Sequence, residues 1–132
     1  MIKFLLDTDT CIYALRHLPG PIREMLTANE GRMAISSVTL FELAYGAEKS
    51  RHVERNLGVL ESFASRLDLK QFDAKAAYQA GQIRAELERK GTPIGAYDLM
   101  IAGQARAEGL ILVTSNTREF KRVSGLRLEN WA

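Results

Sequence analysis

Short apolar runs, each followed at once by polar residues, mark the predicted strands of this chain. Residues 2–6, 32–35 and 110–113 form runs that are apolar or nearly so. Such runs are typical of interior strands in a parallel sheet, where both faces of the strand are buried. Residues 67–72 alternate between apolar and polar, which predicts an edge strand. A last short strand is predicted at residues 126–128.

Apolar residues spaced three or four positions apart predict helices between these strands. The longest predicted helix follows Asp73, an N-capping residue type. Its apolar stripe consists of Ala76, Ala80, Ile83 and Leu87. Gly91 ends this helix, and Gly109 ends the next one, which has Asp98 at its N-terminus. Further helices are predicted at about residues 8–18, 22–28, 39–47 and 55–65, with a helical turn at 118–121.

Strands that alternate with helices predict an α/β fold with a short, mostly parallel central sheet and helices on both faces. The chain of 132 residues is the length of one domain, and residues 1–132 are predicted to form one. In open α/β sheets, ligands bind beyond the carboxyl ends of the strands. Chemistry is therefore expected at the polar segment 114–116 and at its counterparts after the other strands.

Three carboxylates stand where strands and helices meet. Asp7 follows the first strand, Glu42 lies in the helix after the second, and Asp98 opens the helix before the strand at 110–113. Each also has a purely structural explanation. Asp7 or Asp9 can cap a helix, Thr39 and Glu42 have the spacing of a capping box, and Asp98 can bind the free N–H groups of its own helix.

The α/β arrangement sends these acids to one edge of the sheet, where like charges raise one another's pKa. A bound cation would remove this repulsion. Oxygen ligands suit Mg²⁺ or Mn²⁺, and such an ion can activate water and stabilise charge on a phosphodiester. Two basic groups would supply phosphate contacts if they border the acids. They are Lys49, Arg51, His52 and Arg55, and Arg118, Lys121 and Arg122.

Composition and motifs exclude several other classes of protein. Hydrophobic residues make up 46% and charged residues 26%, as in ordinary globular proteins, and the net charge of +2 permits nucleic-acid binding without arguing for it. The apolar runs are too short to span a membrane and the N-terminus is too short for a signal peptide, so a cytoplasmic protein is expected. The single cysteine, Cys11, excludes an internal disulfide and lies in an apolar helix, which favours a buried side chain over a nucleophile. Phosphate-loop and dinucleotide-binding glycine motifs are absent from the sequence.

Four stretches of the sequence resemble the PIN-domain ribonucleases and, within them, the VapC toxins of bacterial toxin–antitoxin pairs. They are LLDTDTCIYAL, ISSVTLFELAYGAEKS, RAELERKGTPIGAYDLMIAGQA and VTSNTREFKRVSGLRLENW. The similarity is greatest to the VapC branch described as cutting initiator tRNA in its anticodon stem-loop. The resemblance implies a PIN-like fold and an endoribonuclease that depends on Mg²⁺, with Mn²⁺ as a substitute. It also implies a homodimer that is neutralised by a VapB-type antitoxin, whose C-terminal segment lies across the active-site groove.

The resemblance also assigns roles to individual residues. Asp7, Glu42 and Asp98 correspond to the metal ligands of the family. The usual fourth acid falls at Asn116, an amide, so that either Asn116 or Glu119 would take its place, through a metal-bound water. Four further residues would lie behind the ligands and support them, and these are Thr8, Asp9, Ser37 and Thr114. Asp9 stands where the family usually has Asn.

Two alternatives remain open from the sequence. The segment LLDTDT matches the D-x-D-x-T signature of haloacid-dehalogenase-type phosphatases, in which Asp7 would be the nucleophile and Asp9 the general acid. That family also needs a later lysine and a distal acidic pair, and no such pair follows the third strand. A PIN domain that binds RNA or antitoxin without catalysis is the second alternative, because Asn116 weakens the acid cluster. Metal-dependent RNA cleavage by the purified protein would distinguish the ribonuclease from this non-catalytic domain.

Overall fold

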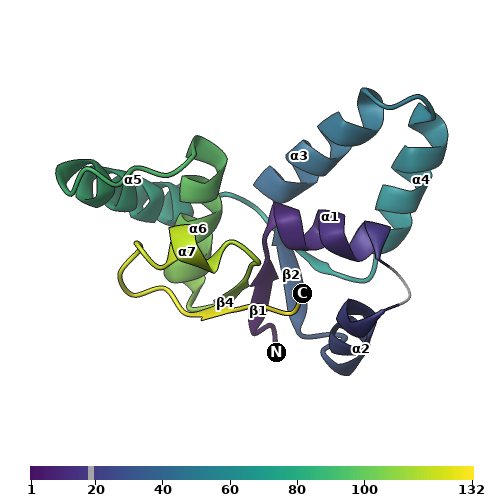
Figure 1. The fold of residues 1–132 in the computed structure, drawn as a ribbon, viewed down its shortest axis with the longest axis horizontal. Coiled ribbons are helices and arrows are strands. Elements are labelled where there is room, and N and C mark those ends of the chain that lie inside the picture. Colours follow the sequence, from purple (N-terminus) through teal and green to yellow (C-terminus); the bar gives the residue numbers. More distant parts are fainter. Residues whose placement is uncertain (18–19) are drawn as a thin grey trace.

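The computed structural model describes residues 1–17 and 20–132, in which strands and helices alternate as expected (Figure 1). The strands are β1 (Phe4–Leu6), β2 (Met33–Ser36), β3 (Asp68–Lys70), β4 (Ile111–Val113) and β5 (Leu128–Glu129). The helices are α1 (Thr8–Arg16), α2 (Pro21–Ala28), α3 (Ser37–Glu48), α4 (Val53–Ala64), α5 (Ala74–Arg89), α6 (Ala96–Glu108) and α7 (Thr117–Phe120).

The five strands form one sheet in the order β3-β2-β1-β4-β5, and every pair is parallel. The expectation of a mostly parallel sheet is confirmed, as is the edge position of β3. The central strand is β1, where Leu5 pairs with Ala34 on one side and with Leu112 on the other. Because β1 is central, Asp7 leaves the sheet in the middle of its carboxyl edge.

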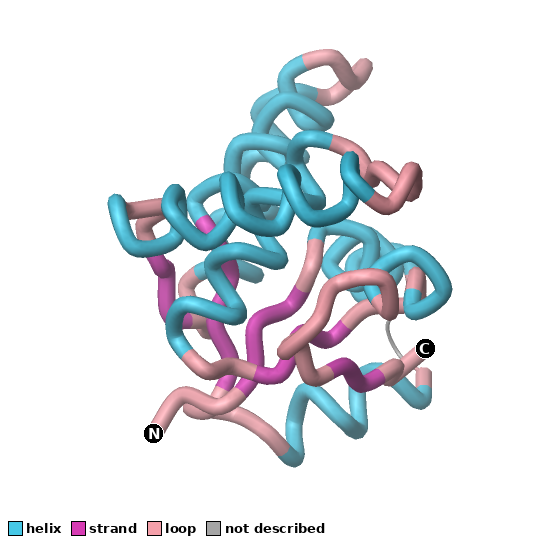
Figure 2. Tube along the Cα trace, turned by 90° about the vertical axis from the view of Figure 1, so that its left-hand side faces the viewer, coloured by secondary structure: helices cyan, strands magenta, loops and turns pink. Residues whose placement is uncertain are grey.

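Helices cover both faces of the sheet (Figures 1 and 2). Phe4 and Leu6 belong to one core cluster, which includes residues of α1, α2 and α4. Leu5, between them, belongs to a second cluster with residues of α5 and α6. Successive side chains of a strand point to opposite faces, so this division follows from the pleat. It explains why β1 is apolar at every position rather than alternating.

Two glycines shape the region around α6. A Cβ atom at Gly103 would lie 2.6 Å from the backbone nitrogen of Ala80, so α5 and α6 approach each other closely there. Gly109 has a φ of 66°, in the left-handed region, and it ends α6 as the sequence predicts. The predicted capping of α5 is also confirmed, because the Asp73 side chain accepts a hydrogen bond of 3.0 Å from the Ala76 backbone.

Some boundaries differ from the predicted ones. Helix α3 begins at Ser37, two residues early, because the Ser36 hydroxyl accepts a hydrogen bond of 3.0 Å from the Val38 N–H as the N-cap. The predicted capping box of Thr39 and Glu42 is therefore wrong. Strand β2 ends one residue later than predicted, α4 starts two residues earlier, and β5 starts two residues later. The predicted end of the first helix near residue 18 lies outside the described residues.

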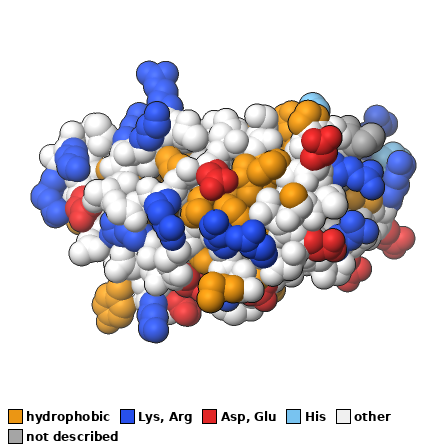
Figure 3. Space-filling view, turned by 90° about the horizontal axis from the view of Figure 1, so that it is seen from below, with side chains coloured by type: hydrophobic (Ala, Val, Ile, Leu, Met, Phe, Trp, Pro, Cys, Tyr) orange, Lys and Arg blue, Asp and Glu red, His pale blue; other side chains and the backbone are white. Residues whose placement is uncertain are grey.

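The side of the molecule at the base of Figure 1 faces the viewer in Figure 3. It carries scattered Lys and Arg side chains with some Asp and Glu, and apolar side chains lie near its centre. Within the described residues, none of the helices combines the length and apolar character that a membrane span requires. Cys11 is fully buried as predicted, and burial raises the pKa of its thiol, which makes it a poor nucleophile.

Candidate active site

Several elements end or begin at the carboxyl edge of the two central strands, β1 and β4. Asp7 comes directly after β1 and Thr114 directly after β4. Asp98 lies in the first turn of α6, and Glu42 lies one turn further into α3. In a parallel sheet these positions share one edge, which is where ligands bind.

Asp7 is held at this edge by a set of hydrogen bonds. Its side chain is 2% exposed and accepts a hydrogen bond of 2.8 Å from the Thr10 backbone, as the N-cap of α1. The Thr10 hydroxyl donates to the Val113 carbonyl over 3.0 Å and so ties the start of α1 to the end of β4. Burial raises the pKa of Asp7, hydrogen bonding from Thr114 and Thr10 opposes the rise, and the charge of Asp9 adds to it. The capping explanation for Asp7 is thus confirmed, and it does not exclude a role in chemistry.

The pKa of Asp98 responds both to burial and to the charges of the other acids at this edge. Burial raises the pKa of this half-buried carboxyl to about 7, and the next causes are the charges of Glu119, Asp7, Asp9 and Glu42, in that order. Gly95, not Asp98, is the N-cap of α6, so the capping explanation for Asp98 is not confirmed. We call these five carboxylates, Asp7, Asp9, Glu42, Asp98 and Glu119, the acid cluster.

Thr8 connects α1 to α3 beneath the cluster. Its hydroxyl donates to the Glu42 carboxylate over 2.6 Å and lies 3.1 Å from the Thr39 hydroxyl. A hydroxyl has one proton to donate, so Thr39 serves as the donor in the second contact. Thr39 is fully buried and was missed as a site residue, because its spacing to Glu42 suggested a cap. Thr8 thereby contacts Glu42, one of the predicted metal ligands, and its supporting role stays a prediction.

Asn116 and Glu119 form a pair at the start of α7. The Asn116 amide donates to the Glu119 carboxylate over 2.8 Å, and the Asn116 backbone donates to the Thr114 hydroxyl over 2.9 Å. Glu119 is the strongest of the charges that raise the pKa of Asp98. The Asn116 amide therefore orients Glu119, and which of the two takes the place of the usual fourth acid stays a prediction.

The remaining predicted residues differ in their surroundings. Asp9 is exposed in the first turn of α1, and its negative charge contributes to the raised pKa of Asp98. The Ser37 hydroxyl accepts a hydrogen bond of 3.0 Å from the Phe72 backbone and so ties α3 to the segment after β3. Its predicted role behind the ligands stays a prediction.

The two basic groups belong to different parts of the chain, one at α7 and the other from the end of α3 into α4. Arg122 donates to the Pro93 carbonyl over 3.1 Å, which connects the α7 group to the segment before α6. The other group begins at Lys49, the C-cap of α3. Lys49 lies about 10 Å beyond Glu42 along that helix, at a rise of 1.5 Å per residue.

The donor chemistry of the acid cluster fits a hard divalent cation, since every member is a carboxylate. Asp7, Glu42 and Asp98 would be the ligands, with Glu119 beside them. As the side chains stand, no three His, Cys, Asp or Glu residues of the described segments converge as a ligand set. Glu42 and Glu119 each accept a hydrogen bond, from Thr8 and Asn116 respectively. The chemistry of the donors thus fits, whereas a closed coordination shell is not formed by these side-chain positions.

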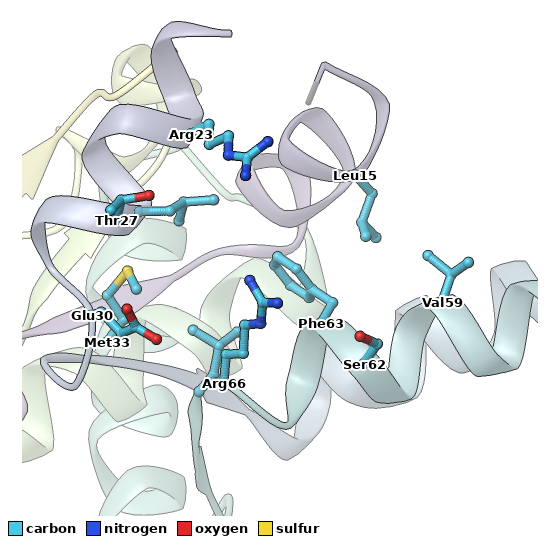
Figure 4. A pocket seen from close by; sticks show the side chains of 11 residues that line it. Leu15, Arg23, Thr27, Glu30, Met33, Val59, Ser62, Phe63 and Arg66 are labelled. Atoms are coloured by element: carbon cyan, nitrogen blue, oxygen red, sulfur yellow. The ribbon is translucent and has the colours of Figure 1, made fainter. Parts of the chain in front are cut away.

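An apolar groove of about 410 Å³ lies elsewhere on the molecule, between α1, α2 and α4 (Figure 4). Leu15, Phe63 and Val59 line it, together with Arg23 and Arg66. Leu15 is about 12 Å along α1 from Asp7, at 1.5 Å per residue. The groove is therefore separate from the acid cluster.

Comparison with known proteins shows the family of the chain. Residues 4–126 match the family model of the PIN domain, so the chain belongs to the PIN-domain family. The chain is 58% identical to the tRNA(fMet)-specific endonuclease VapC of Shigella flexneri over 132 residues, which is the whole of both chains. Within the PIN-domain family it therefore groups with the VapC ribonucleases.

Solved structures give the same result for the fold. The VapBC complex of Salmonella typhimurium bound to DNA contains a chain with a TM-score of 0.97 and 57% identity, and the match covers 100% of both chains. VapBC2 of Rickettsia felis, bound to a DNA fragment from its promoter, matches with a TM-score of 0.90 and 45% identity, again over 100% of both chains. The expected PIN-like fold is confirmed.

Proposed function

We propose that this chain is a Mg²⁺-dependent endoribonuclease, with Mn²⁺ as a substitute, that cleaves initiator tRNA in its anticodon stem-loop. The observation that carries the proposal is the acid cluster at the carboxyl edge of β1 and β4, where Asp7 caps α1 and the adjacent Thr8 hydroxyl donates to Glu42 over 2.6 Å. The substrate is inferred from the Shigella flexneri relative, which is a tRNA(fMet)-specific endonuclease. Neither the phosphatase nor the non-catalytic alternative is favoured by the relatives.

Individual residues at this edge have different proposed roles. Asp7, Glu42 and Asp98 would hold the ion, which when bound supplies an activated water and stabilises charge on the phosphate. Thr8 orients Glu42 through its 2.6 Å hydrogen bond. Asp7 is kept in place by its own cap bond to the Thr10 backbone.

Asn116 orients Glu119 in the same way, through its 2.8 Å hydrogen bond. Glu119 would take the position of the fourth acid and would help to hold the ion through an intervening water. In this assignment Asn116 is a positioning residue, and its amide replaces the carboxylate that the family usually has there.

The partners follow from the VapBC complexes of related proteins. We propose that a VapB-type antitoxin neutralises this chain by laying its C-terminal segment across the active-site groove. The toxin itself is proposed to be a homodimer that forms a higher assembly with the antitoxin. A cytoplasmic location is expected for such a pair, and it is compatible with the unpaired, buried Cys11.

The test is cleavage of purified initiator and elongator tRNAs by the wild type and by Asp7→Asn, Glu42→Gln and Asp98→Asn. Each substitution should abolish cleavage and leave the thermal transition cooperative, because each removes one carboxylate from a site with few ligands. If a variant loses activity only because it unfolds, the replaced residue has a structural role and not a catalytic one. Retained activity in all three variants would refute the proposed chemistry.

A further inference from the structure

Two exposed aromatic side chains lie beside the acid cluster. Phe41 and Tyr97 are 54% and 46% exposed, and each directly precedes an acid, Glu42 and Asp98 respectively. Their rings touch edge to face, with centroids 5.7 Å apart and an angle of 62° between the planes. The pair therefore bridges α3 and α6, the two helices that carry these acids.

Packing of the core does not account for this pair. On the same two helices, Leu43 and Leu99 are buried at 8% and 7% exposure and supply the contacts with the interior. Exposed apolar side chains that gather at one place often mark a binding surface. An edge-to-face pair also leaves ring surface open to solvent, which agrees with the half-exposure of both side chains.

The exposed face of α3 continues this surface away from the acids. Phe41 is followed at four-residue intervals by Tyr45, which is 58% exposed, and by Lys49. The Lys49 ammonium lies 5.0 Å from the centroid of the Tyr45 ring. Beyond it, Arg51 and Arg55 are exposed. Aromatic rings followed by cations along one path are the features that bind single-stranded nucleic acid, by base stacking and phosphate contact.

We propose that Phe41 and Tyr97 form a stacking platform for an unpaired base of the RNA, next to the phosphate that is cleaved. The RNA strand on one side of that base would follow α3 towards Tyr45 and Lys49. This inference rests on the proposed ribonuclease function and deepens it, because it names the part of the substrate that is recognised. A base inside a duplex cannot offer its face to the platform, so the platform selects loops.

The experiment measures kcat and KM of the full chain on an RNA hairpin with an unpaired loop. Phe41→Leu and Tyr97→Leu keep apolar volume and remove the aromatic face. Each should raise KM by a factor on the order of 5 to 100, the range that corresponds to loss of one stacked base, with a smaller change in kcat. Phe41→Tyr and Tyr97→Phe should restore the wild-type KM. The matched control is Tyr78→Leu on α5, where the tyrosine is 82% exposed, and it should cleave as the wild type does.

A second measurement identifies the base. Hairpins in which one loop nucleotide at a time lacks its base are compared with the intact hairpin. At one position, loss of the base should raise KM for the wild type but have little further effect on the two Leu variants. That lack of additivity is the sign that the base and the rings contact each other.

The outcomes separate the possible failures. Leu variants with wild-type KM, while the wild type cleaves RNA, would refute the platform alone. If light scattering shows that the Leu variants change the oligomeric state, and the KM effect appears only with that change, the surface is an interface between copies and the platform is wrong. A wild type that cleaves no RNA would refute the proposed function, and the platform with it.

Discussion

Replacement of Asp98 by Asn should stabilise the metal-free protein, although it removes a group needed for activity. In the folded chain the pKa of Asp98 is raised from 3.8 to about 7, first by burial and then by the charges of Glu119, Asp7, Asp9 and Glu42. A carboxyl with a raised pKa binds its proton more tightly in the folded state. The contribution of Asp98 to the free energy of unfolding is therefore greatest below pH 4. It falls as the pH rises from about 4 through 7.

The size of the effect follows from the same values. A pKa that moves from 3.8 to about 7 corresponds to about 4 kcal/mol for a fully buried group. Asp98 is only half-buried, and solvent screening reduces the expected contribution to about 1–2 kcal/mol at pH 8. For a domain of this size, that is a rise in Tm of roughly 3–8 °C for Asp98→Asn.

The assay is thermal melting of the wild type and Asp98→Asn in excess chelator at pH 5, 6, 7 and 8. The Tm of Asp98→Asn relative to that of the wild type should increase steadily as the pH rises. The control is Asp73→Asn, at the N-cap of α5, where Asn caps as well as Asp and no such gain is expected. A variant that is less stable than the wild type at every pH would refute the reasoning, because it would show that the Asp98 carboxylate stabilises the fold.

Three further outcomes are expected. Asp9→Asn should retain most RNA cleavage at saturating Mg²⁺, whereas a phosphatase that uses Asp9 as general acid would lose a factor on the order of 10² to 10⁴ on a phosphate monoester. Mg²⁺ or Mn²⁺ should restore cleavage after chelation and Ca²⁺ should not, since Ca²⁺ prefers more ligands, and full activity in excess chelator would contradict this. Gly103→Ala should destabilise the fold by about 1–3 kcal/mol in urea unfolding, because its Cβ would meet the Ala80 backbone. The control Gly81→Ala, at an exposed helical position with open space around it, should be neutral or stabilising by up to about 1 kcal/mol.

The sequence predicts the strands and the position of Asp7 well, because an apolar run that ends in a capping residue has few other interpretations. It cannot decide where α3 begins, since Ser36 and Thr39 are both capping residue types. In the structure Ser36 is the N-cap, whereas Thr39 makes a buried contact with Thr8, which joins segments that are distant in the sequence. A local pattern contains no information about such a contact.

The fourth acid illustrates a similar limit. The sequence offers Asn116 and Glu119 as alternatives because both lie just after the strand at residues 110–113. Only the hydrogen bond between them shows that one residue orients the other. The Phe41–Tyr97 contact is likewise absent from sequence reasoning, because neither residue belongs to a motif with a known spacing.

The central place of β1 in the sheet has a consequence for the synthesis of the protein. Leu5 in β1 pairs with Leu112 in β4, so this pairing cannot form until most of the chain has been made. Pairings between segments this far apart in sequence form slowly, because the loop between them must close first. On the ribosome, β1 can meet β2 early, but Asp7 cannot meet Asp98 and Glu119 until translation is nearly complete. The site is therefore completed only when the last part of the chain has been made, and truncated products that end before β4 lack both Glu119 and the strand that pairs with β1 beside Asp7.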